Sequence, residues 1–413
     1  MLRMIRHRLR SALTGRNKHV NNLVSDLYGG LVTKYEAGEI RGIAIIPSAF
    51  EFEELYNQRT INLSKYLSGK GYGVIYVAWQ WYKTEKLEKS YRYVYKNVIQ
   101  VPLYGFLDTH FKLAMFSAFR KRIYMVTLPA KVFYDLLFFM KESCFDVYYD
   151  IMDDWEQFHK VGQAPWYKSG IDEAVILNAN KVTAVSARLV RKFSHLREDI
   201  VCVGNGYDPE ILSAGEAAEE KPGETAGETA GETPTIRAGY FGHLTDAWFD
   251  WQMLFDLTEK HGNVIVEIIG YGESAATRKR IGSSSNIKLI GKVEPGALRA
   301  YASKWHVAII PFKKSELSEA VDPIKIYEYL YFGLPAVVTG ISHLRDYPYV
   351  EVVDNDPEQF YNALLNAYGN RRENGVDNDK INLFLSDKTW ENRFDRLFEP
   401  DFLSVLYDGL EPI

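Results

Sequence analysis

A lysine and a glutamate three residues apart are the first candidates for chemistry in this sequence. Lys325 and Glu328 lie in PIKIYEYLYFGLPAVVTG, residues 323–340, ahead of a glycine–proline break and a short apolar run. With Asp322 as N-cap and Pro323 at the first helical position, a helix is predicted to begin here. Its first-turn N–H groups and Lys325 suit an anion such as phosphate, and the Glu328 carboxylate suits a vicinal diol such as ribose. The stretch favours a holder for a nucleotide diphosphate; the alternative is an exposed intrahelical ion pair.

A second candidate is the acidic stretch YYDIMDDWEQFH, residues 148–159, which follows an apolar run. Carboxylates at the end of a strand in an α/β sheet are well placed for general base catalysis. The candidates for this role are Asp150, Asp153 and Asp154, with His159 as an outside possibility. The alternative is structural, because Asp153 or Asp154 would also cap a helix that starts at Trp155.

The elements that must position these residues alternate along the first half of the sequence. Six apolar runs have the length of buried strands: 42–49, 73–79, 122–127, 146–151, 181–187 and 200–204. Helical patterns lie between most of them. Strand–helix alternation predicts a parallel, doubly wound sheet.

The second half starts the alternation again after a stretch of different composition. Residues 213–235 contain the repeat GETAGETAGET and no aromatic or large apolar residue, which indicates a disordered linker or a surface insertion. Five further strands are predicted at 236–244, 264–272, 287–291, 306–312 and 335–340. A last amphipathic helix is predicted at 390–398. The sequence therefore predicts two Rossmann-like domains.

The bulk properties agree with a folded two-domain protein and exclude several other classes. The chain has 413 residues, 46% of them hydrophobic and 25% charged, and a net charge of −5, which argues against a nucleic-acid binder. Its two cysteines, Cys144 and Cys202, fit a reduced cytoplasmic chain. No 18-residue apolar run and no secretory signal occur, and no His/Cys cluster has metal-ligand spacing, so no metal is expected.

Two basic segments suggest contact with a membrane surface. In the N-terminal segment Leu2, Ile5 and Leu9 form an apolar stripe flanked by Arg3, Arg6, Arg8 and Arg10. Region 103–142 interleaves aromatic residues with the cluster Arg120, Lys121 and Arg122. Each segment also has a structural interpretation: a frayed, solvated helix for the first, and a core helix with a charged end for the second. Weak peripheral contact with anionic lipid is the functional hypothesis.

Several motifs in the second half resemble one enzyme family. Residues 323–340 look like the donor-site segment of GT-B glycosyltransferases of the family 4-like group, whose usual form is P-x-K-x-x-E-Y-x-x-x-G-x-P-V-V. GYFGHLTDAWFDWQML resembles their strand, glycine loop and helix, and VEIIGYGE and the segment 287–312 match the next strands in order. VGNGYDPEIL is similar to their inter-domain segment and TWENRFDRL to their closing helix.

The first half resembles transferases of bacterial cell-surface polysaccharides, including the teichuronic-acid type, at residues 46–77 and 147–158. The resemblance implies an α/β GT-B fold, two Rossmann-like doubly wound domains facing across a cleft. The domains expected from it are a basic N-terminal helical extension (1–40), an acceptor-side domain (41–205), a linker or insertion (206–235), a donor domain (236–385) and a helix crossing back (386–413).

Carried over by position, the resemblance also assigns a donor site. Glu328 would hold the ribose hydroxyls and Lys325 would lie near the diphosphate. The glycine-loop residues would be Gly242 and His243, and the base-binding loop would be Ile290, Gly291, Lys292 and Val293. In the retaining enzymes a second glutamate stands eight residues before the ribose glutamate; here Ala320 takes that place, with Glu319 beside it.

The expected activity is transfer of a hexose from a nucleoside-diphosphate sugar to a growing cell-surface glycan or a lipid-linked acceptor, without metal or cofactor. The enzyme is expected in the cytoplasm or on the inner face of the plasma membrane. Two alternatives share the architecture: a nucleotide-sugar 2-epimerase, which needs no acceptor, and a non-catalytic GT-B partner that only binds glycan or nucleotide. The missing second glutamate keeps the last alternative open.

Overall fold

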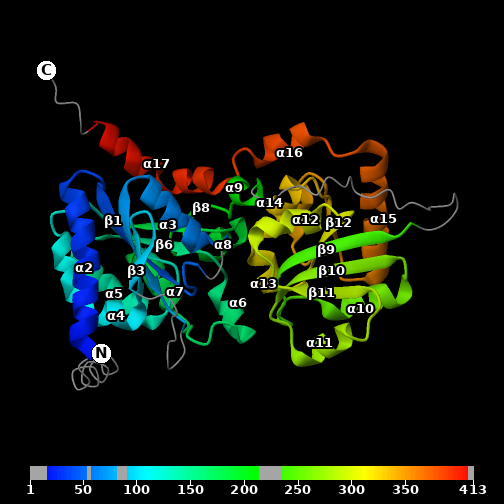
Figure 1. The fold of residues 1–413 in the computed structure, drawn as a ribbon, viewed down its shortest axis with the longest axis horizontal. Helices are drawn as coiled ribbons and strands as arrows, with labels where there is room; N and C mark the ends of the chain where they lie inside the picture. Colours follow the sequence, from blue (N-terminus) through cyan, green and yellow to red (C-terminus); the bar gives the residue numbers. More distant parts are fainter. Residues whose placement is uncertain (1–15, 54–56, 81–90, 214–233, 408–413) are drawn as a thin grey trace. The chain divides into compact units, whose positions relative to one another are not determined.

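The computed structural model describes residues 16–53, 57–80, 91–213 and 234–407, and it divides into two compact α/β units (Figure 1). Unit 1 consists of Met1–Gly204 and Phe394–Ile413, and unit 2 of Asn205–Arg393. Each unit has its own sheet, with helices packed around it.

Unit 1 is built on an eight-stranded sheet in the order β3-β4-β2-β1-β5-β6-β7-β8. All neighbouring strands are parallel except β3 and β4, which are antiparallel. The strands are β1 Gly42–Ser48, β2 Tyr72–Ala78, β3 Arg92–Tyr95, β4 Val98–Pro102, β5 Lys121–Val126, β6 Asp146–Ile151, β7 Lys181–Ala184 and β8 Val201–Cys202. The strands β1 and β2 are buried along their whole length, as expected for central parallel strands covered on both faces.

The helices of unit 1 mostly connect successive strands, as doubly wound topology requires. They are α2 Arg16–Glu36, α3 Arg59–Gly69, α4 Leu103–Thr109, the 3₁₀ helix η1 His110–Phe116, α5 Lys131–Glu142, α6 Trp155–Lys160, α7 Ile171–Asn178 and α8 Ala187–Phe193. The first of these, α2, buries Val24, Tyr28 and Leu31 completely. Residues 16–36 are thus anchored in unit 1 by an apolar face.

Unit 2 is built on a six-stranded parallel sheet in the order β11-β10-β9-β12-β13-β14. The strands are β9 Ile236–His243, β10 Val264–Tyr271, β11 Ile287–Gly291, β12 Val307–Pro311, β13 Ala336–Thr339 and β14 Val350–Val353. In the core, Trp305 lies against the backbone of Gly239, where an added Cβ would be 1.8 Å from the indole ring. The Trp305 Nε1–H donates to the buried Glu267 carboxylate at 3.1 Å, so the indole has no unsatisfied polar group.

The helices of unit 2 also alternate with the strands. They are α9 Pro209–Ser213, α10 Trp251–Lys260, α11 Ala275–Ile281, the 3₁₀ helix η2 Pro295–Ala297, α12 Leu298–Ala302, α13 Glu316–Ala320, α14 Ile324–Tyr331, η3 Ser342–Asp346, α15 Pro357–Asn374 and α16 Asn378–Leu385. The last helix, α17 Trp390–Tyr407, begins in unit 2 and continues into unit 1.

The two places where the chain passes between units are joined by backbone pairing within unit 2. Tyr207 and Thr389 form an isolated parallel bridge. A Cβ added at Gly206 would be 2.8 Å from the Trp390 nitrogen, so this approach requires glycine. The segment VGNGYDPEIL, which resembles the inter-domain segment of the family, therefore runs alongside the start of α17.

The structure contains elements that the hydrophobic pattern did not reveal. The strands β3 and β4 form a tight hairpin with Asn97 at a φ of 58°. In β3 the burial alternates, and β14 is partly exposed along its length, which is typical of edge strands and gives a weak apolar signal. The edge strands β3 and β14 were missed for that reason.

The aromatic residues of region 103–142 are mostly core residues. Phe106, Phe116 and Phe119 are buried, whereas Phe111 is 57% exposed. The structural interpretation of this region therefore holds for most of its aromatic side chains, and the exposed Phe111, Phe138 and Tyr104 are the exceptions.

Two sequence-based predictions lie outside the described residues: the arginine stripe within residues 1–15 and the GETAGETAGET repeat within 214–233. Among the helices that the structure describes, none is long and apolar enough to cross a membrane.

Candidate functional site

The carboxyl end of β9 brings Gly242 against Lys325 of α14. A Cβ added at Gly242 would be 2.9 Å from the Lys325 Cε, and the glycine has a φ of 144°, which other residues rarely adopt. The Lys325 Nζ lies 5.4 Å from the centre of the Tyr240 ring and 5.3 Å from that of Phe312. The lysine is thus held over the glycine loop by two aromatic rings, and its position depends on the missing side chain at Gly242.

The charge of Lys325 is weakly stabilised in this position. Burial lowers the pKa of Lys325 to about 8, although the nearby Glu328 carboxylate opposes this shift. Glu328 lies one turn further along α14 and is itself buried. The lysine cation is partly removed from water, and the Glu328 carboxylate balances its charge only in part. Such a cation is well suited to bind an anionic ligand.

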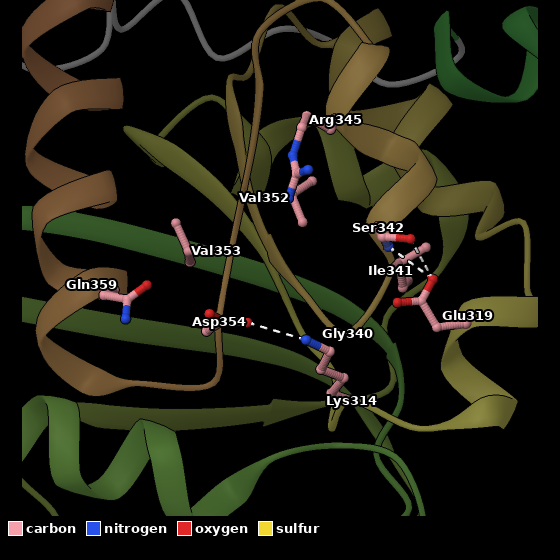
Figure 2. A pocket seen from close by; sticks show the side chains of 10 residues that line it. All are labelled: Lys314, Glu319, Gly340, Ile341, Ser342, Arg345, Val352, Val353, Asp354 and Gln359. Atoms are coloured by element: carbon pink, nitrogen blue, oxygen red, sulfur yellow. Dashed lines mark hydrogen bonds and ion pairs between the residues drawn. The ribbon is translucent and has the colours of Figure 1, made fainter.

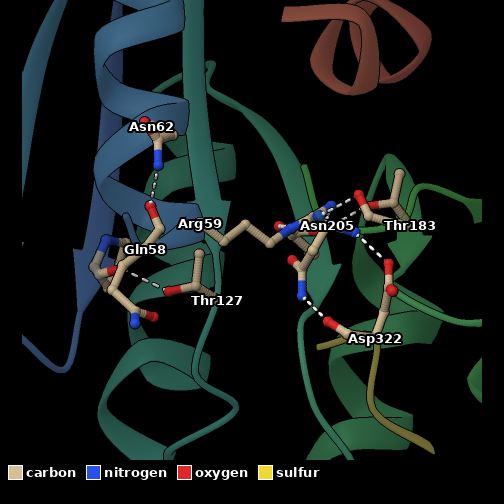
Figure 3. Close-up of polar contacts among 10 residues, drawn as sticks. Gln58, Arg59, Asn62, Thr127, Thr183, Asn205 and Asp322 are labelled. Carbon is tan, nitrogen blue, oxygen red and sulfur yellow. Dashed lines mark hydrogen bonds and ion pairs between the residues drawn. The ribbon is translucent and has the colours of Figure 1, made fainter. Parts of the chain in front are cut away.

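The start of α14 is fixed differently from the prediction. The N-cap residue is Pro323, and Asp322 makes no capping hydrogen bond, so its predicted role as N-cap is wrong. The Asp322 carboxylate instead accepts hydrogen bonds from the Tyr327 hydroxyl at 2.8 Å and from the Asn205 N–H at 2.7 Å. The Asn205 side-chain amide donates to the Asp322 carbonyl at 2.6 Å (Figure 3). These bonds tie α14, which carries Lys325 and Glu328, to the first residue of unit 2.

His243, at the end of β9, lies near both Lys325 of α14 and Lys292, which follows β11. The His243 ring packs over Gly272, where an added Cβ would be 2.7 Å from the ring. The Lys292 Nζ lies 3.9 Å from the centre of the Tyr271 ring. Partial burial and then the charge of Lys325 lower the pKa of His243, with a smaller contribution from Lys292. The structure therefore brings together three of the predicted donor-site side chains around His243: the cations Lys325 and Lys292 and the His243 imidazole.

The other predicted residues of the β11 loop differ in what they offer. The side chains of Ile290 and Val293 pack against the hydrophobic core of unit 2, so their backbone groups are the parts suited to a ligand. Gly291, between them, has a φ of 90° and lets the strand turn at this point.

Glu319, beside the position of the absent second glutamate, is engaged elsewhere. Its carboxylate accepts hydrogen bonds from the Ser342 hydroxyl at 2.6 Å and the Ser342 N–H at 3.2 Å. Ala320 is fully buried. Glu319 lines a cavity of about 270 Å³ near Gly340, shown in Figure 2 with Lys314, Ser342 and Arg345. In the same cavity Lys314 pairs with Asp354 at 3.4 Å, so both carboxylates there already have partners.

In unit 1, Asp150 is a structural anchor. Its carboxylate is fully buried and accepts hydrogen bonds from Arg59 at 2.7 and 2.9 Å and from the Thr183 hydroxyl at 2.8 Å. Arg59 extends from α3 toward this site and also donates to the Gly204 carbonyl at 2.9 Å; Arg59 and Thr183 are labelled in Figure 3. A bidentate, buried pair of this kind gives Asp150 a structural role, since both carboxylate oxygens are engaged within unit 1.

Asp154 has the capping role that the sequence left open. Its carboxylate accepts a hydrogen bond from the Gln157 N–H at 3.2 Å, which caps α6, and it forms an ion pair with Lys192 at 2.7 Å. His159 is bonded through Nδ1 to the Ala164 carbonyl oxygen at 2.8 Å. Both groups are therefore engaged in local structure.

Asp153 is different from its two neighbours. In the described part of the chain no hydrogen bond or ion pair holds its carboxylate. Burial raises the pKa of Asp153 to about 7, with the Asp154 carboxylate as the next cause and the Arg59 charge opposing. A carboxylate without a partner and with a pKa near neutrality has the properties of a general base. The contacts with Arg59 and Lys192 are what give the three carboxylates different roles. Both partners are distant in sequence, so nothing near residues 150–154 indicated these contacts.

No metal site accompanies these residues in the part of the chain that the structure describes: no three His, Cys, Asp or Glu side chains are grouped so that they could hold an ion.

Replacing Gly242 by alanine tests the contact with Lys325. We expect Gly242→Ala to weaken binding of a nucleoside diphosphate at least fivefold, about 1 kcal/mol, because the new methyl group displaces Lys325 and strains the backbone. Isothermal titration calorimetry measures this effect. Gly282→Ala is the matched control, since Gly282 has a negative φ and its added Cβ would meet only ordinary contacts, the nearest at 3.5 Å. Equal affinities for the two variants would contradict the interpretation.

Comparison with known proteins finds one family match. Residues 244–370, which lie within unit 2, match the sequence model of the family described as glycosyl transferases group 1. No curated protein sequence is significantly similar to the chain.

Solved structures resemble the chain over nearly its whole length. Sucrose-phosphate synthase from Thermosynechococcus elongatus superposes with a TM-score of 0.64 at 13% identity, covering 88% of this chain and 100% of that one. Anabaena HepE in complex with UDP and glucose gives 0.60 at 11%, covering 87% and 99%. The lipopolysaccharide outer core galactosyltransferase WaaB gives 0.56 at 13%, covering 87% and 99%. The predicted α/β fold with two doubly wound parallel sheets is confirmed, and it is the GT-B fold.

Proposed function

We propose that the protein is a glycosyltransferase that uses a nucleoside-diphosphate sugar as donor. The observation that carries the proposal is the arrangement in unit 2 in which Lys325 lies against Gly242, with Glu328 one turn further along the same helix. The match of residues 244–370 to the glycosyl transferases group 1 model supports it. So does the similarity in fold to HepE, whose structure contains UDP and glucose.

The groups of unit 2 would bind the donor. Lys325, Lys292 and His243 would neutralise the diphosphate, which must leave with a negative charge when the sugar is transferred. Glu328 would accept hydrogen bonds from the two ribose hydroxyls, and backbone groups of the 290–293 loop would contact the base. Because protein cations are available for the leaving group, we propose that transfer needs no metal and no further cofactor.

Unit 1 would supply the group that acts on the acceptor. A sugar acceptor attacks through a hydroxyl group, whose proton must be removed as the glycosidic bond forms. Asp153 is our choice for this base, since its carboxylate is the one of the three that is not engaged by Arg59 or Lys192. This assignment favours a catalyst over a non-catalytic binding partner.

We propose a bacterial cell-surface glycan or its lipid-linked precursor as acceptor, with transfer of a hexose in the cytoplasm. The support is the resemblance of the first half to polysaccharide transferases, including the teichuronic-acid type, and the similarity in fold to WaaB, an enzyme of the lipopolysaccharide outer core.

Titration calorimetry with UDP, ADP and GDP, followed by assays with the matching nucleotide sugars, tests the proposal. We expect one nucleoside diphosphate to bind and its sugar to be transferred only when an acceptor glycan is present. Release of a free epimerised sugar without acceptor would identify a 2-epimerase instead. Binding of none of the three nucleotides would refute the proposed donor site.

The role of Glu328 can be tested with deoxynucleotides. We expect the wild-type protein to bind a ribonucleoside diphosphate about 10-fold or more tightly than its 2′-deoxy form, because a hydrogen bond to a carboxylate contributes about 1.5–3 kcal/mol. Glu328→Gln should lose most of this preference, and Glu328→Ala should weaken binding of the ribonucleotide by a similar factor. A preference that survives both substitutions, measured by calorimetry, would show that another residue contacts the ribose.

Peripheral membrane binding is a further expected property. Each basic residue near an anionic leaflet contributes about 1 kcal/mol, which salt screens. We therefore expect weak, salt-sensitive co-sedimentation with anionic vesicles, lost when Arg3, Arg6, Arg8 and Arg10 are changed to serine. Equal binding to neutral vesicles, or no binding at low salt, would favour a soluble acceptor.

A further inference from the structure

His243 occupies a position that constrains both its orientation and its charge. Its ring lies over Gly272, 5.3 Å from the centre of the Tyr271 ring and 5.6 Å from that of Trp248. The Tyr240 hydroxyl donates to the His243 carbonyl at 3.1 Å and fixes the backbone. The residue nevertheless remains exposed to solvent, so a ligand can reach the ring.

The charged groups around the ring come from three different elements. Lys325 approaches from α14 and Lys292 from the end of β11, and both disfavour a positive charge on the imidazole. Glu273, which follows β10, opposes them; its carboxylate is inaccessible to solvent and forms an ion pair with Arg278. The titratable hydroxyls of Tyr240 and Tyr271 belong to the same surroundings. Partial burial and then the charges of Lys325 and Lys292 lower the pKa of His243, which favours the neutral ring in the absence of a ligand.

We propose that His243 determines specificity for the diphosphate by becoming protonated when a nucleoside diphosphate binds at the Lys325–Lys292 cluster. This inference rests on the proposed donor site. The proton comes from solvent, and the resulting imidazolium supplies an additional cation only while the diphosphate is present. A nucleoside monophosphate brings less negative charge and induces protonation less.

The physical reason is the balance of charges around one ring. In the free protein, protonation of His243 would place a third cation beside two lysines, with one carboxylate opposing them. A bound diphosphate reverses the sign of this field, and an opposite charge at short distance favours the protonated form. Because binding and protonation are linked, the affinity must depend on pH, and each binding event must take up protons.

The experiment is calorimetry at pH 7.0 in buffers of different ionisation enthalpy, with whichever of UDP, ADP and GDP binds most tightly. The slope of observed enthalpy against buffer enthalpy gives the number of protons taken up. The terminal phosphate of the nucleotide itself titrates with a pKa of about 6, so the relevant quantity is the difference between wild type and His243→Asn. We expect that difference to be a large part of one proton per nucleotide.

Two further measurements separate this role from a structural one. His243→Asn should weaken nucleoside-diphosphate binding about five- to tenfold at pH 7.0 and change binding of the monophosphate much less. Lys292→Gln, which leaves His243 in place but removes one opposing cation, should shift proton uptake to higher pH. Circular dichroism checks that both variants are folded.

The outcomes are distinct. If the wild type and His243→Asn both bind the diphosphate with the same proton uptake, the inference is wrong and the proposed donor site survives. If the wild type binds none of the three nucleotides, the proposed function and this inference both fail. A Lys292→Gln variant with an unshifted uptake profile would also count against the proposed role of His243.

Discussion

Asp153→Asn is expected to lower kcat for sugar transfer about 10²- to 10⁴-fold, the range that general base catalysis contributes. The asparagine keeps the shape of the side chain but cannot accept the acceptor proton. The rate of nucleoside diphosphate release in the presence of acceptor measures the effect. Donor affinity should stay unchanged, because Asp153 belongs to unit 1 and the donor residues belong to unit 2.

The pH profile gives an independent test of the same assignment. Because the pKa of Asp153 is raised to about 7, the base is protonated and inactive at lower pH, and kcat/KM should rise as the pH increases through 7. Asp154→Asn is the matched control: it removes the α6 cap and the Lys192 ion pair, so it should lower stability more than kcat. A kcat for Asp153→Asn within about threefold of wild type would exclude Asp153 as the base.

The second large effect concerns donor affinity. We expect Lys325→Met to weaken binding of the preferred nucleoside diphosphate roughly 10- to 150-fold, the equivalent of about 1.5–3 kcal/mol for losing bonds to a charged group. Methionine preserves the apolar contacts with Tyr240 and Phe312, so the substitution removes mainly the charge. Lys325→Ala, which also loses these contacts, should bind the nucleotide no more tightly than Lys325→Met does. Calorimetry at pH 7 measures both.

The lowered pKa of Lys325 makes donor affinity depend on pH. This affinity should fall as the pH rises, whereas the kcat/KM controlled by Asp153 should increase. Above pH 8 the free lysine loses its proton, so affinity for the anion should fall by up to about tenfold per pH unit in the wild type. Lys325→Met should lack this decline. Lys304→Ala, which changes an exposed lysine just before β12, should bind like the wild type. A pH-independent wild-type affinity between pH 7 and 9.5 would contradict the assignment.

The repeating elements of the fold could be predicted because most of its strands are buried on both faces. Strands β1 and β12 are continuous apolar runs, so their positions follow from composition alone. Edge strands are different. In β3, Tyr93 and Tyr95 are exposed and alternate with partly buried neighbours, and such a short pattern does not stand out from loop sequence.

The candidate site was predictable where it depends on local spacing. Lys325 and Glu328 lie on one helix, and three residues of separation place them one turn apart on it. By contrast, the roles of Asp150 and Asp322 depend on partners distant in sequence: Arg59 is 91 residues from Asp150, and Asn205 is 117 from Asp322. Sequence spacing carries no information about such contacts, so the three acidic candidates could not be separated without the structure.

The order in which this chain leaves the ribosome has a consequence for how unit 1 folds. Unit 1 needs the C-terminal segment: Phe394 and Phe398 are fully buried, and both rings lie near Tyr66 of α3, at 5.4 and 5.8 Å. The Tyr66 hydroxyl also donates to Asp395 at 2.7 Å. Domains usually fold in the order of their synthesis, yet here unit 2 is complete within Asn205–Arg393 and emerges entirely before the residues that cover α3. During translation the apolar surface of α3 around Tyr66 must therefore stay uncovered until residues 394–398 have been made, so we expect the nascent chain to bind chaperones at this stage.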